Sequence, residues 1–482
     1  MINANRIINI LGLLLVIEGV FISLCIPVAF YYGDGDFQAF CITALVMFST
    51  GLAFWFFTRN TDRSIGKREG FIIVSLVWIV ISFFGCLPFW LSGSVASFTD
   101  SFFETISGFT TTGASILVDI EAMPRGLLLW RSMTQWLGGM GIIVLSLAIL
   151  PALGVGGMQL FVAEVPGPTK EKLHPRVEQT ARRLWGIYIL FTGLEMVLLL
   201  AGGMSLFDSV CHSFTTMATG GYSTKQASIA YFDSAYIQYV ITFFMFIAGT
   251  NFILSYFAIH LRFEKIWKNE EFRFYLGSVL FFIVIFSVGL FLTGNGSVEE
   301  SFRLASFQVV SIITTTGFVS ADYLLWIPLL SVLIFVMMFF GGSAGSTGGG
   351  VKIIRVLLIM KNSYIEIKRL IYPNAVIPVR LNNRPISQNV IGNVLAYTFI
   401  YILVMAISLV VISSMGYNLD TAFGAAAATL GNIGPGIGLV GPAENYAHFS
   451  GFGKWFLSFL MLLGRLELFT VLVLFIPSFW RK

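Results

Sequence analysis

Charged residues are scarce in this sequence. Asp, Glu, Lys and Arg make up 11% of its 482 residues, whereas a soluble globular domain carries about 25%. Hydrophobic residues make up 56% of the chain, and its mean hydropathy is +0.85. The basic residues are not interleaved with exposed aromatic ones, as they are on nucleic-acid-binding surfaces. The composition excludes a soluble domain or a nucleic-acid-binding module and predicts a membrane protein with several spanning helices.

Cysteine and histidine are also rare, with four residues of each. The cysteines lie in apolar stretches without a C-x-x-C pair, so we expect buried thiols rather than disulfides or metal ligands. They are Cys25, Cys41, Cys86 and Cys211. The first apolar stretch follows Arg6 and has no small-residue cleavage site after it. It is therefore expected to remain in the protein as a membrane helix.

Apolar windows of about 20 residues predict the spanning helices. About ten such windows occur, near 8–30, 38–57, 71–92, 128–150, 184–204, 236–260, 275–293, 325–358, 390–413 and 453–478. The predicted fold class is therefore an all-α polytopic membrane protein with both termini on one side. The loops rich in Lys and Arg are every second one, near 59–68, 170–183, 262–273 and 361–384. The positive-inside rule places these loops and both termini in the cytoplasm.

Four times along the chain, a stretch too short to cross a bilayer ends in a glycine-rich segment. They run over 100–113, 208–221, 307–317 and 420–434. Each lies on the outer side between two predicted spans, so the unit span–short helix–loop–span recurs about every 100 residues. Units of one orientation are related by an axis along the membrane normal, which predicts a central pore. The predicted organisation is two extra N-terminal helices in 1–66 and pore repeats in 67–165, 166–268, 269–384 and 385–482.

The end of each segment is predicted to form one strand of a potassium filter. Backbone carbonyls and threonine hydroxyls can replace the water around the ion, and glycine allows the backbone angles that turn successive carbonyls toward one axis. Aspartates at the starts of the short helices are N-cap residue types, and the C-terminal ends of these helices would favour a cation. Four ordinary outer loops are the alternative, which four matching positions disfavour. The predicted filter residues are Thr110, Thr111, Thr112, Gly113, Ala218, Thr219, Gly220, Gly221, Thr314, Thr315, Thr316, Gly317, Gly431, Asn432, Ile433 and Gly434.

A second glycine-rich run interrupts the eighth predicted span halfway. A run of this composition cannot remain a regular helix, so we expect an unwound segment at mid-membrane. Our hypothesis is a gate that obstructs the pore below the filter and moves to open it. A helix break for close packing is the alternative. The run consists of Gly341, Gly342, Ser343, Ala344, Gly345, Ser346, Thr347, Gly348, Gly349 and Gly350.

Arg465 lies inside the last predicted span. A charge at such a position costs several kcal/mol and normally faces the bundle interior or a water-filled cavity. Our hypothesis is a pore barrier, in which Arg465 lies just below the filter and repels cations. The alternatives are snorkelling to the interface, or an ion pair with Glu467 or Glu195.

Three other functions fit parts of the sequence. A sodium- or proton-coupled symporter would need buried carboxylates, for which Glu18, Glu195 and Glu467 are the candidates. An intramembrane serine protease could use Ser343, because residues 341–345 fit G-x-S-x-G. That motif requires a preceding strand and a soluble sheet, and neither is predicted. A structural scaffold would leave the four repeats unexplained, and we therefore expect a transporter rather than an enzyme.

As a set, residues 110–113, 219–221, 314–317 and 432–436, the run 341–350 and Arg465 resemble the Trk/Ktr/HKT superfamily of potassium transporters. The two extra N-terminal spans resemble the Trk branch. The resemblance implies potassium as the transported ion, no organic cofactor on this chain, and a bacterial inner-membrane homodimer with one pore per subunit. It also implies that a cytosolic ring of RCK-type nucleotide-binding subunits controls the gate. Its expected docking surfaces are the loops 166–183 and 361–384.

The same resemblance bears on ion selectivity. In the superfamily, glycine at the last position of all four strands goes with potassium selectivity, and serine at the first of these positions goes with sodium transport. This chain has glycine at all four positions. Ala218 departs from the Thr-Thr-Thr-Gly pattern, and residues 431–433 depart further. Fewer hydroxyl groups are therefore expected around some of the ion sites.

Overall fold

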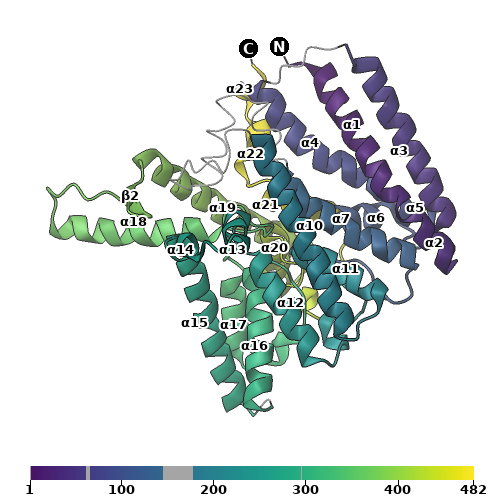
Figure 1. Ribbon diagram of the computed structural model, residues 1–482. Helices are drawn as coiled ribbons and strands as arrows, with labels where there is room; N and C mark the ends of the chain where they lie inside the picture. The colour runs from purple at the N-terminus through teal and green to yellow at the C-terminus, as the bar shows by residue number, and fades with distance from the viewer. Residues whose placement is uncertain (1, 61–65, 145–176, 295, 482) are drawn as a thin grey trace.

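The computed structural model describes residues 2–60, 66–144, 177–294 and 296–481 (Figure 1). Within these ranges the regular structure is helical except for one two-stranded hairpin, in which β1 (Arg380–Leu381) pairs antiparallel with β2 (Arg384–Pro385). The predicted all-α class is therefore confirmed.

The helices are distributed over both halves of the chain. The N-terminal half contains α1 (Ala4–Ser23), α2 (Ile26–Tyr32), α3 (Phe37–Thr58), α4 (Lys67–Gly85), α5 (Leu87–Leu91), α6 (Phe98–Phe109), α7 (Arg125–Val144), α10 (Val177–Ala201), α11 (Leu206–Met217), the 3-10 helix η2 (Ser228–Tyr231), α12 (Ala235–Ala248), α13 (Phe252–Ile259) and α14 (Phe263–Trp267). The C-terminal half contains α15 (Glu270–Leu292), α16 (Val298–Ile313), η3 (Tyr323–Leu325), α17 (Pro328–Met337), α18 (Ile353–Ile371), α19 (Gln388–Ser414), α20 (Leu419–Gly431), η4 (Gly438–Val440), α21 (Gly451–Arg465), α22 (Phe469–Leu472), η5 (Val473–Phe475) and α23 (Pro477–Trp480).

Most of the predicted spans correspond to long apolar helices. Within the described residues, six helical stretches are long and apolar enough to cross a membrane, or up to eight if each of two bent pairs is one span. The predicted span at 128–150 corresponds to α7 up to residue 144, and the rest of the predicted range lies outside the described residues. The span at 325–358 is divided into α17 and α18 by the glycine-rich run.

Two predicted spans are bent rather than straight. α12 and α13 meet at 111°, and α21 meets the stretch from Phe469 to Phe475 at 112°. At the first bend the Asn251 side chain accepts a hydrogen bond from the Ile253 amide at 2.8 Å, which caps a new helix. At the second bend Glu467 and Leu468 have positive φ angles of 55° and 32°. Hydropathy predicted these two spans but does not detect the local features that bend them.

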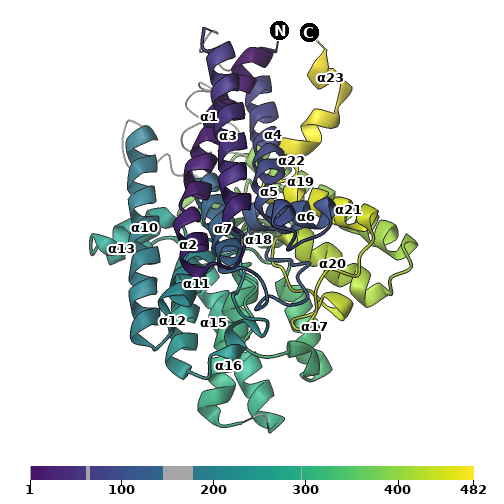
Figure 2. The same ribbon diagram turned by 90° about the vertical axis from the view of Figure 1, so that its right-hand side faces the viewer.

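The arrangement of the helices places both chain ends together. The N- and C-termini lie at the same end of the molecule in two perpendicular views, near α1, α3 and α4 (Figures 1 and 2). α18 lies across the direction of α15, α16 and α17 and carries the hairpin away from the body (Figure 1). Its direction differs from the expected continuation of a span, because the chain turns within the run 341–350.

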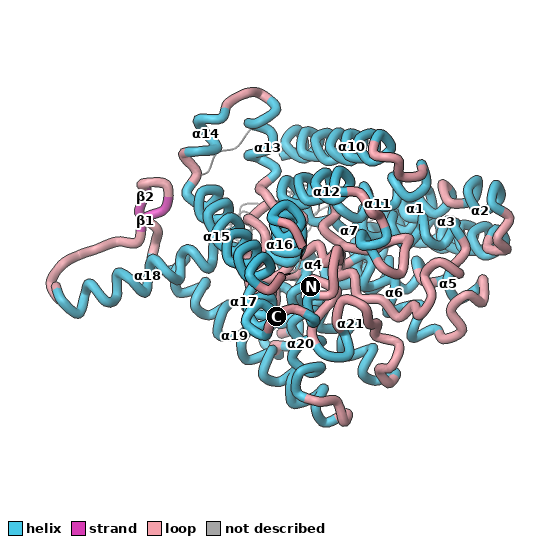
Figure 3. Tube along the Cα trace, turned by 90° about the horizontal axis from the view of Figure 1, so that it is seen from below, coloured by secondary structure: helices cyan, strands magenta, loops and turns pink. Residues whose placement is uncertain are grey.

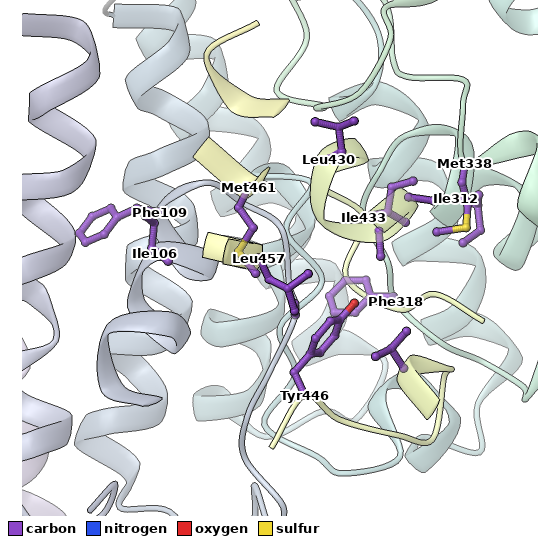
Figure 4. Packing of buried hydrophobic residues seen from close by; sticks show 14 of the residues in the cluster. Ile106, Phe109, Ile312, Phe318, Met338, Leu430, Ile433, Tyr446, Leu457 and Met461 are labelled. Atoms are coloured by element: carbon purple, nitrogen blue, oxygen red, sulfur yellow. The ribbon is translucent and has the colours of Figure 1, made fainter. Parts of the chain in front are cut away.

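Four short helices form the centre of the core. Every residue of 101–109 in α6, 305–313 in α16 and 424–431 in α20 is buried, and α11 is buried over most of its length. A helix that is buried on all sides belongs to the interior of a larger bundle. Figure 3 shows these helices around a middle that is occupied by loop segments. In Figure 4, Leu457 and Met461 of α21 lie between Phe109 of α6 and the pair Leu430 and Ile433.

Candidate ion-conduction site

The four short helices end in the same way. Each predicted filter segment consists of four residues, at 110–113, 218–221, 314–317 and 431–434. The second residue of each has a left-handed backbone, with φ of 51° at Thr111, 54° at Thr219, 59° at Thr315 and 52° at Asn432. The amide of that residue donates to the carbonyl three residues earlier, and the next amide donates to the carbonyl five residues earlier. Left-handed backbone is a genuine outlier for a β-branched residue. The three threonines therefore share a geometry that the surrounding structure imposes.

The last residue of each segment is a glycine with positive φ, between 79° and 90° at the four positions. A Cβ atom on any of these glycines would lie under 3.0 Å from a carbonyl oxygen of another segment. The pairs are Gly113 with Gly220, Gly221 with Thr316, Gly317 with Ile433, and Gly434 with Thr112. The four segments therefore follow one another in a closed ring. One hollow in the protein surface is lined by all four of these glycines.

The starts of the same helices differ from the prediction. The caps lie earlier in the chain, where Ser205, Ser297 and Asn418 accept hydrogen bonds from the amides three residues later at 3.1–3.2 Å. α6 likewise begins after Ser97. The aspartates that were predicted as caps lie in the first turn instead, where a negative charge complements the helix dipole. They are Asp100, Asp208 and Asp420.

Side chains support the segments unequally. In the first and third segments the first and third threonine hydroxyls lie 2.8 Å apart, as between Thr110 and Thr112. The second and fourth segments have no such pair, because Ala218 and Gly431 occupy the first position. In the fourth segment the Asn432 side-chain amide donates to Thr112 Oγ1 and to the Met461 carbonyl, each at 2.9 Å.

The glycine-rich loop, residues 341–350, lies directly against the second positions of these segments. The Gly349 amide donates to Thr315 Oγ1 at 2.7 Å, and the hydroxyls of Thr219 and Thr347 are 3.3 Å apart. All loop residues except Gly345 are buried. Gly349 also lies against Gly431 and Asn432. The loop therefore contacts the second, third and fourth segments at the level of their left-handed residues.

Neighbouring helices hold the loop in this position. The Ser343 amide donates to the Gly249 carbonyl at 2.8 Å, at the bend between α12 and α13. The Ala344 amide donates to Glu271 Oε1 in the first turn of α15 at 2.6 Å. The buried Lys352 ammonium donates to the loop's own backbone. Contacts from two helices thus fix a segment that has no regular structure of its own.

Arg465 forms a further contact with the loop. The residue is 2% exposed; its Nη1 donates to the Thr347 carbonyl at 2.7 Å and its Nη2 to the Gly138 carbonyl of α7 at 2.9 Å. Glu467, one of the predicted partners of this arginine, forms an ion pair with Arg355. The guanidinium of Arg465 therefore bridges the loop and α7.

The alternative functions find little support in this geometry. Ser343 Oγ is buried without a hydrogen-bond partner among the described residues, and His212 lies 2.9 Å from Ser223 Oγ through Nε2. The two residues thus do not form a nucleophile and base. Of the candidate coupling carboxylates, Glu18 and Glu195 are buried in α1 and α10. Within the described residues, neither is hydrogen-bonded to a predicted filter segment.

Two charged residues behind the first two segments were not predicted as functional. Glu104 of α6 and Arg131 of α7 form an ion pair of 2.6 Å, and both side chains are at most 3% exposed. The rule that singled out Arg465, a charge inside an apolar segment, applies equally to them.

The predicted docking loop 166–183 lies largely outside the described residues, since residues 145–176 are not described.

Comparisons with known proteins decide the family. A family model, TrkH, described as a cation transport protein, matches residues 36–482. The chain belongs to the TrkH family. It is 44% identical over 482 residues to the Trk system potassium uptake protein TrkH of Salmonella typhimurium, with 99% of both chains covered. It is 35% identical over 458 residues to TrkG of Escherichia coli K12, with 94% of both chains covered.

The TrkH fold extends to the whole chain. The crystal structure of the potassium transporter TrkH from Vibrio parahaemolyticus is 38% identical to this chain and matches it with a TM-score of 0.91. The match covers 99% of this chain and 100% of that chain. The predicted resemblance to the Trk/Ktr/HKT superfamily, and to its Trk branch, is confirmed.

Proposed function

We propose that this TrkH-family protein carries potassium ions across the bacterial inner membrane. Relatives at 44% identity are named potassium uptake proteins. The observation that carries the proposal is the closed ring of four segments, each with a left-handed second residue and a glycine against a neighbouring carbonyl. Carbonyl oxygens in such a ring can replace the hydration shell of an ion. The ring would belong to pore repeats at 67–165, 166–268, 269–384 and 385–482.

The electrostatics of the site suit a cation. α6, α11, α16 and α20 end directly at the four segments, and the C-terminus of a helix carries partial negative charge. Among the described residues, no group of three or more His, Cys, Asp or Glu could hold a metal ion. The transported ion would therefore be bound by carbonyl and hydroxyl oxygens at 110–113, 218–221, 314–317 and 431–434.

The loop 341–350 would act as the gate. It is buried against three of the four segments and held by the bend at Gly249, by Glu271 and by Arg465. All of these contacts would have to rearrange for ions to pass. Arg465 would contribute in two ways, by holding the loop and by placing a positive charge below the filter.

Assembly and regulation are inferred from the family resemblance. A homodimer would have one pore in each subunit, and a cytosolic ring of RCK-type nucleotide-binding subunits would control the gate. α18 and the hairpin project from the body and carry Lys361, Lys368 and Arg369. This projection would provide part of the docking surface at 361–384, on the cytoplasmic side together with both termini.

The test is ion flux into proteoliposomes that contain the purified full-length chain. Potassium, rubidium and sodium would be compared with and without Gly113→Ser. We expect potassium flux well above sodium flux, and a weaker preference in the variant. Equal flux of the two ions in the wild-type protein would overturn the proposal. Deleting residues 343–348 should raise flux if the loop is the gate, and uptake driven by a sodium or pH gradient at fixed voltage would indicate coupled symport instead.

A further inference from the structure

The ion pair between Glu104 and Arg131 lies directly behind the first two segments of the ring. The side chains are 0% and 3% exposed, and Arg131 Nε is 2.6 Å from Glu104 Oε1. The guanidinium also lies over the ring of Tyr222, 3.5 Å from its centroid. Removing two charges from water costs several kcal/mol per ion, so a buried pair is weak evidence for a role in stability alone. The contacts of the pair indicate what else it does.

The pair connects the two stretches of chain that follow the first and second segments, near residues 114–116 and 222–223, which we call the outgoing strands. Glu104 accepts hydrogen bonds from the Ser115 hydroxyl at 3.0 Å and the Ile116 amide at 2.9 Å, just beyond Gly113. Arg131 Nη1 donates to the Ser223 carbonyl at 2.9 Å, two residues beyond the glycine of the second segment. One ion pair thus joins the outgoing strands of the first and second segments.

Two further side chains complete this connection. The Tyr222 hydroxyl donates to the backbone carbonyl of Glu104 at 2.7 Å. Gln135, one helical turn beyond Arg131 in α7, donates to the Gly220 carbonyl at 2.7 Å and accepts from the Tyr222 amide at 3.1 Å. Gly220 supplies the carbonyl that lies beside the glycine of the first segment. The network therefore reaches a carbonyl of the ring itself.

The second segment depends on this support more than the first or third. Those two segments contain a hydroxyl–hydroxyl hydrogen bond of 2.8 Å between their first and third threonines. In the second segment the corresponding residues are Ala218 and Gly220, which have no side-chain hydroxyl. Besides the backbone hydrogen bonds that all four segments share, the second segment is therefore held by Gln135 of α7 at its third carbonyl.

Other contacts between segments are neutral. The Tyr323 hydroxyl donates to the Gly436 carbonyl at 2.7 Å, and the Tyr446 amide donates to the Ser115 carbonyl at 2.8 Å. Within the described parts of the chain, only the first and second segments are joined by an ion pair that also bonds to the residues following each of them. A planar guanidinium can hold several acceptors at fixed angles, which an ammonium cannot.

We infer that Glu104 and Arg131 are positioning residues that hold the second filter strand in register with the first and thereby set the preference for potassium over sodium. The inference rests on the proposed function of the ring as a filter. A shift of about 0.5 Å in a binding group is enough to impair a preorganised site. Loss of the pair should therefore change ion selectivity, which a role in stability alone would not do.

The test compares initial uptake of potassium and sodium by bacterial cells that lack other potassium uptake systems and express each full-length variant. Glu104→Gln removes the negative charge of the acceptor. Arg131→Lys keeps the positive charge but loses the planar guanidinium that bonds to two acceptors at once. Tyr222→Phe removes only the hydroxyl. We expect the potassium-to-sodium ratio to fall by about tenfold or more in Arg131→Lys and by less in Tyr222→Phe. Membrane levels of each variant are measured by immunoblot.

Two substitutions serve as controls. Glu264→Gln removes a carboxylate from an exposed ion pair with Lys268, and Tyr417→Phe removes a hydroxyl that is bonded to the His448 carbonyl. Both should keep the wild-type ratio. If Glu104→Gln fails to reach the membrane, the other two variants still decide the question. A wild-type ratio in Arg131→Lys and Tyr222→Phe would overturn the inference, whereas a wild-type protein without potassium preference would overturn the proposed function itself.

Discussion

Replacing Arg465 should open the conduction path by weakening the closed position of the loop. Its guanidinium donates to the Thr347 carbonyl at 2.7 Å and to the Gly138 carbonyl at 2.9 Å. A hydrogen bond from a charged group contributes about 1.5–3 kcal/mol, and each 1.4 kcal/mol is a factor of about ten. If the bond to Thr347 exists only in the closed state, Arg465→Met should raise the open population by about tenfold to a hundredfold. This range is an upper limit, because water can replace the lost bond in the open state.

The measurement is rubidium uptake into proteoliposomes containing equal amounts of folded protein, with Arg262→Met as a control at an exposed arginine. Arg465→Lys separates the two roles proposed for this residue. An ammonium keeps the positive charge but cannot hold both carbonyls with the geometry of a guanidinium. High flux in Arg465→Lys would indicate that the two hydrogen bonds of the guanidinium keep the pore closed. Low flux would indicate that the positive charge keeps it closed. Unchanged flux in a folded Arg465→Met protein would refute the reasoning.

Three further predictions test the ring, the loop and the protease alternative. Gly113→Ala and Gly203→Ala both place a side chain at positive φ, at a cost of about 1–2 kcal/mol. Only at Gly113 would the new Cβ meet a carbonyl, so only this variant should lose potassium preference in uptake assays; equal ratios would contradict the ring. Glu271→Ala should raise rubidium flux because the Ala344 amide loses its acceptor, whereas Glu271→Gln, which keeps an oxygen, should not. Ser343→Ala should leave rubidium flux unchanged, because Ser343 Oγ has no hydrogen-bond partner among the described residues. Loss of an activity in this variant, with ion flux absent from the wild-type protein, would favour the protease instead.

The parts of the molecule that sequence reasoning predicted have local signals. Membrane spans follow from hydropathy, because about 20 apolar residues are needed to cross a bilayer. The last position of each segment could be predicted because positive φ favours glycine, as at Gly113 and Gly434. The loop 341–350 could be predicted because its composition is incompatible with a helix. In each case the information lies within a few consecutive residues.

The parts that were missed depend on residues far apart in the chain. The bends near Gly249 and Glu467 arise where these residues meet the loop or a partner from another helix. The pairing of Glu104 with Arg131 joins two helices whose relative position cannot be derived from composition. The short helices also began earlier than predicted, because two kinds of residue at their starts, Ser or Asn and then Asp, are both acceptable caps.

The fourth segment shows which feature of the ring is conserved when side chains change. It has no threonine, yet Asn432 has the same left-handed φ, 52°, as the three threonines at the equivalent position. Asn is among the residues that tolerate this conformation, and its side chain bonds to Thr112 and Met461 instead of supplying a hydroxyl to the ring. The carbonyl of Ile433 still lies beside Gly317, as the third carbonyl does at the other three contacts. Selectivity should therefore depend more on backbone carbonyls than on the number of threonine hydroxyls. Asn432→Ala should then impair ion preference more strongly than Thr110→Val, which removes a hydroxyl, does in the same uptake assay. The opposite order would assign selectivity to the hydroxyl groups.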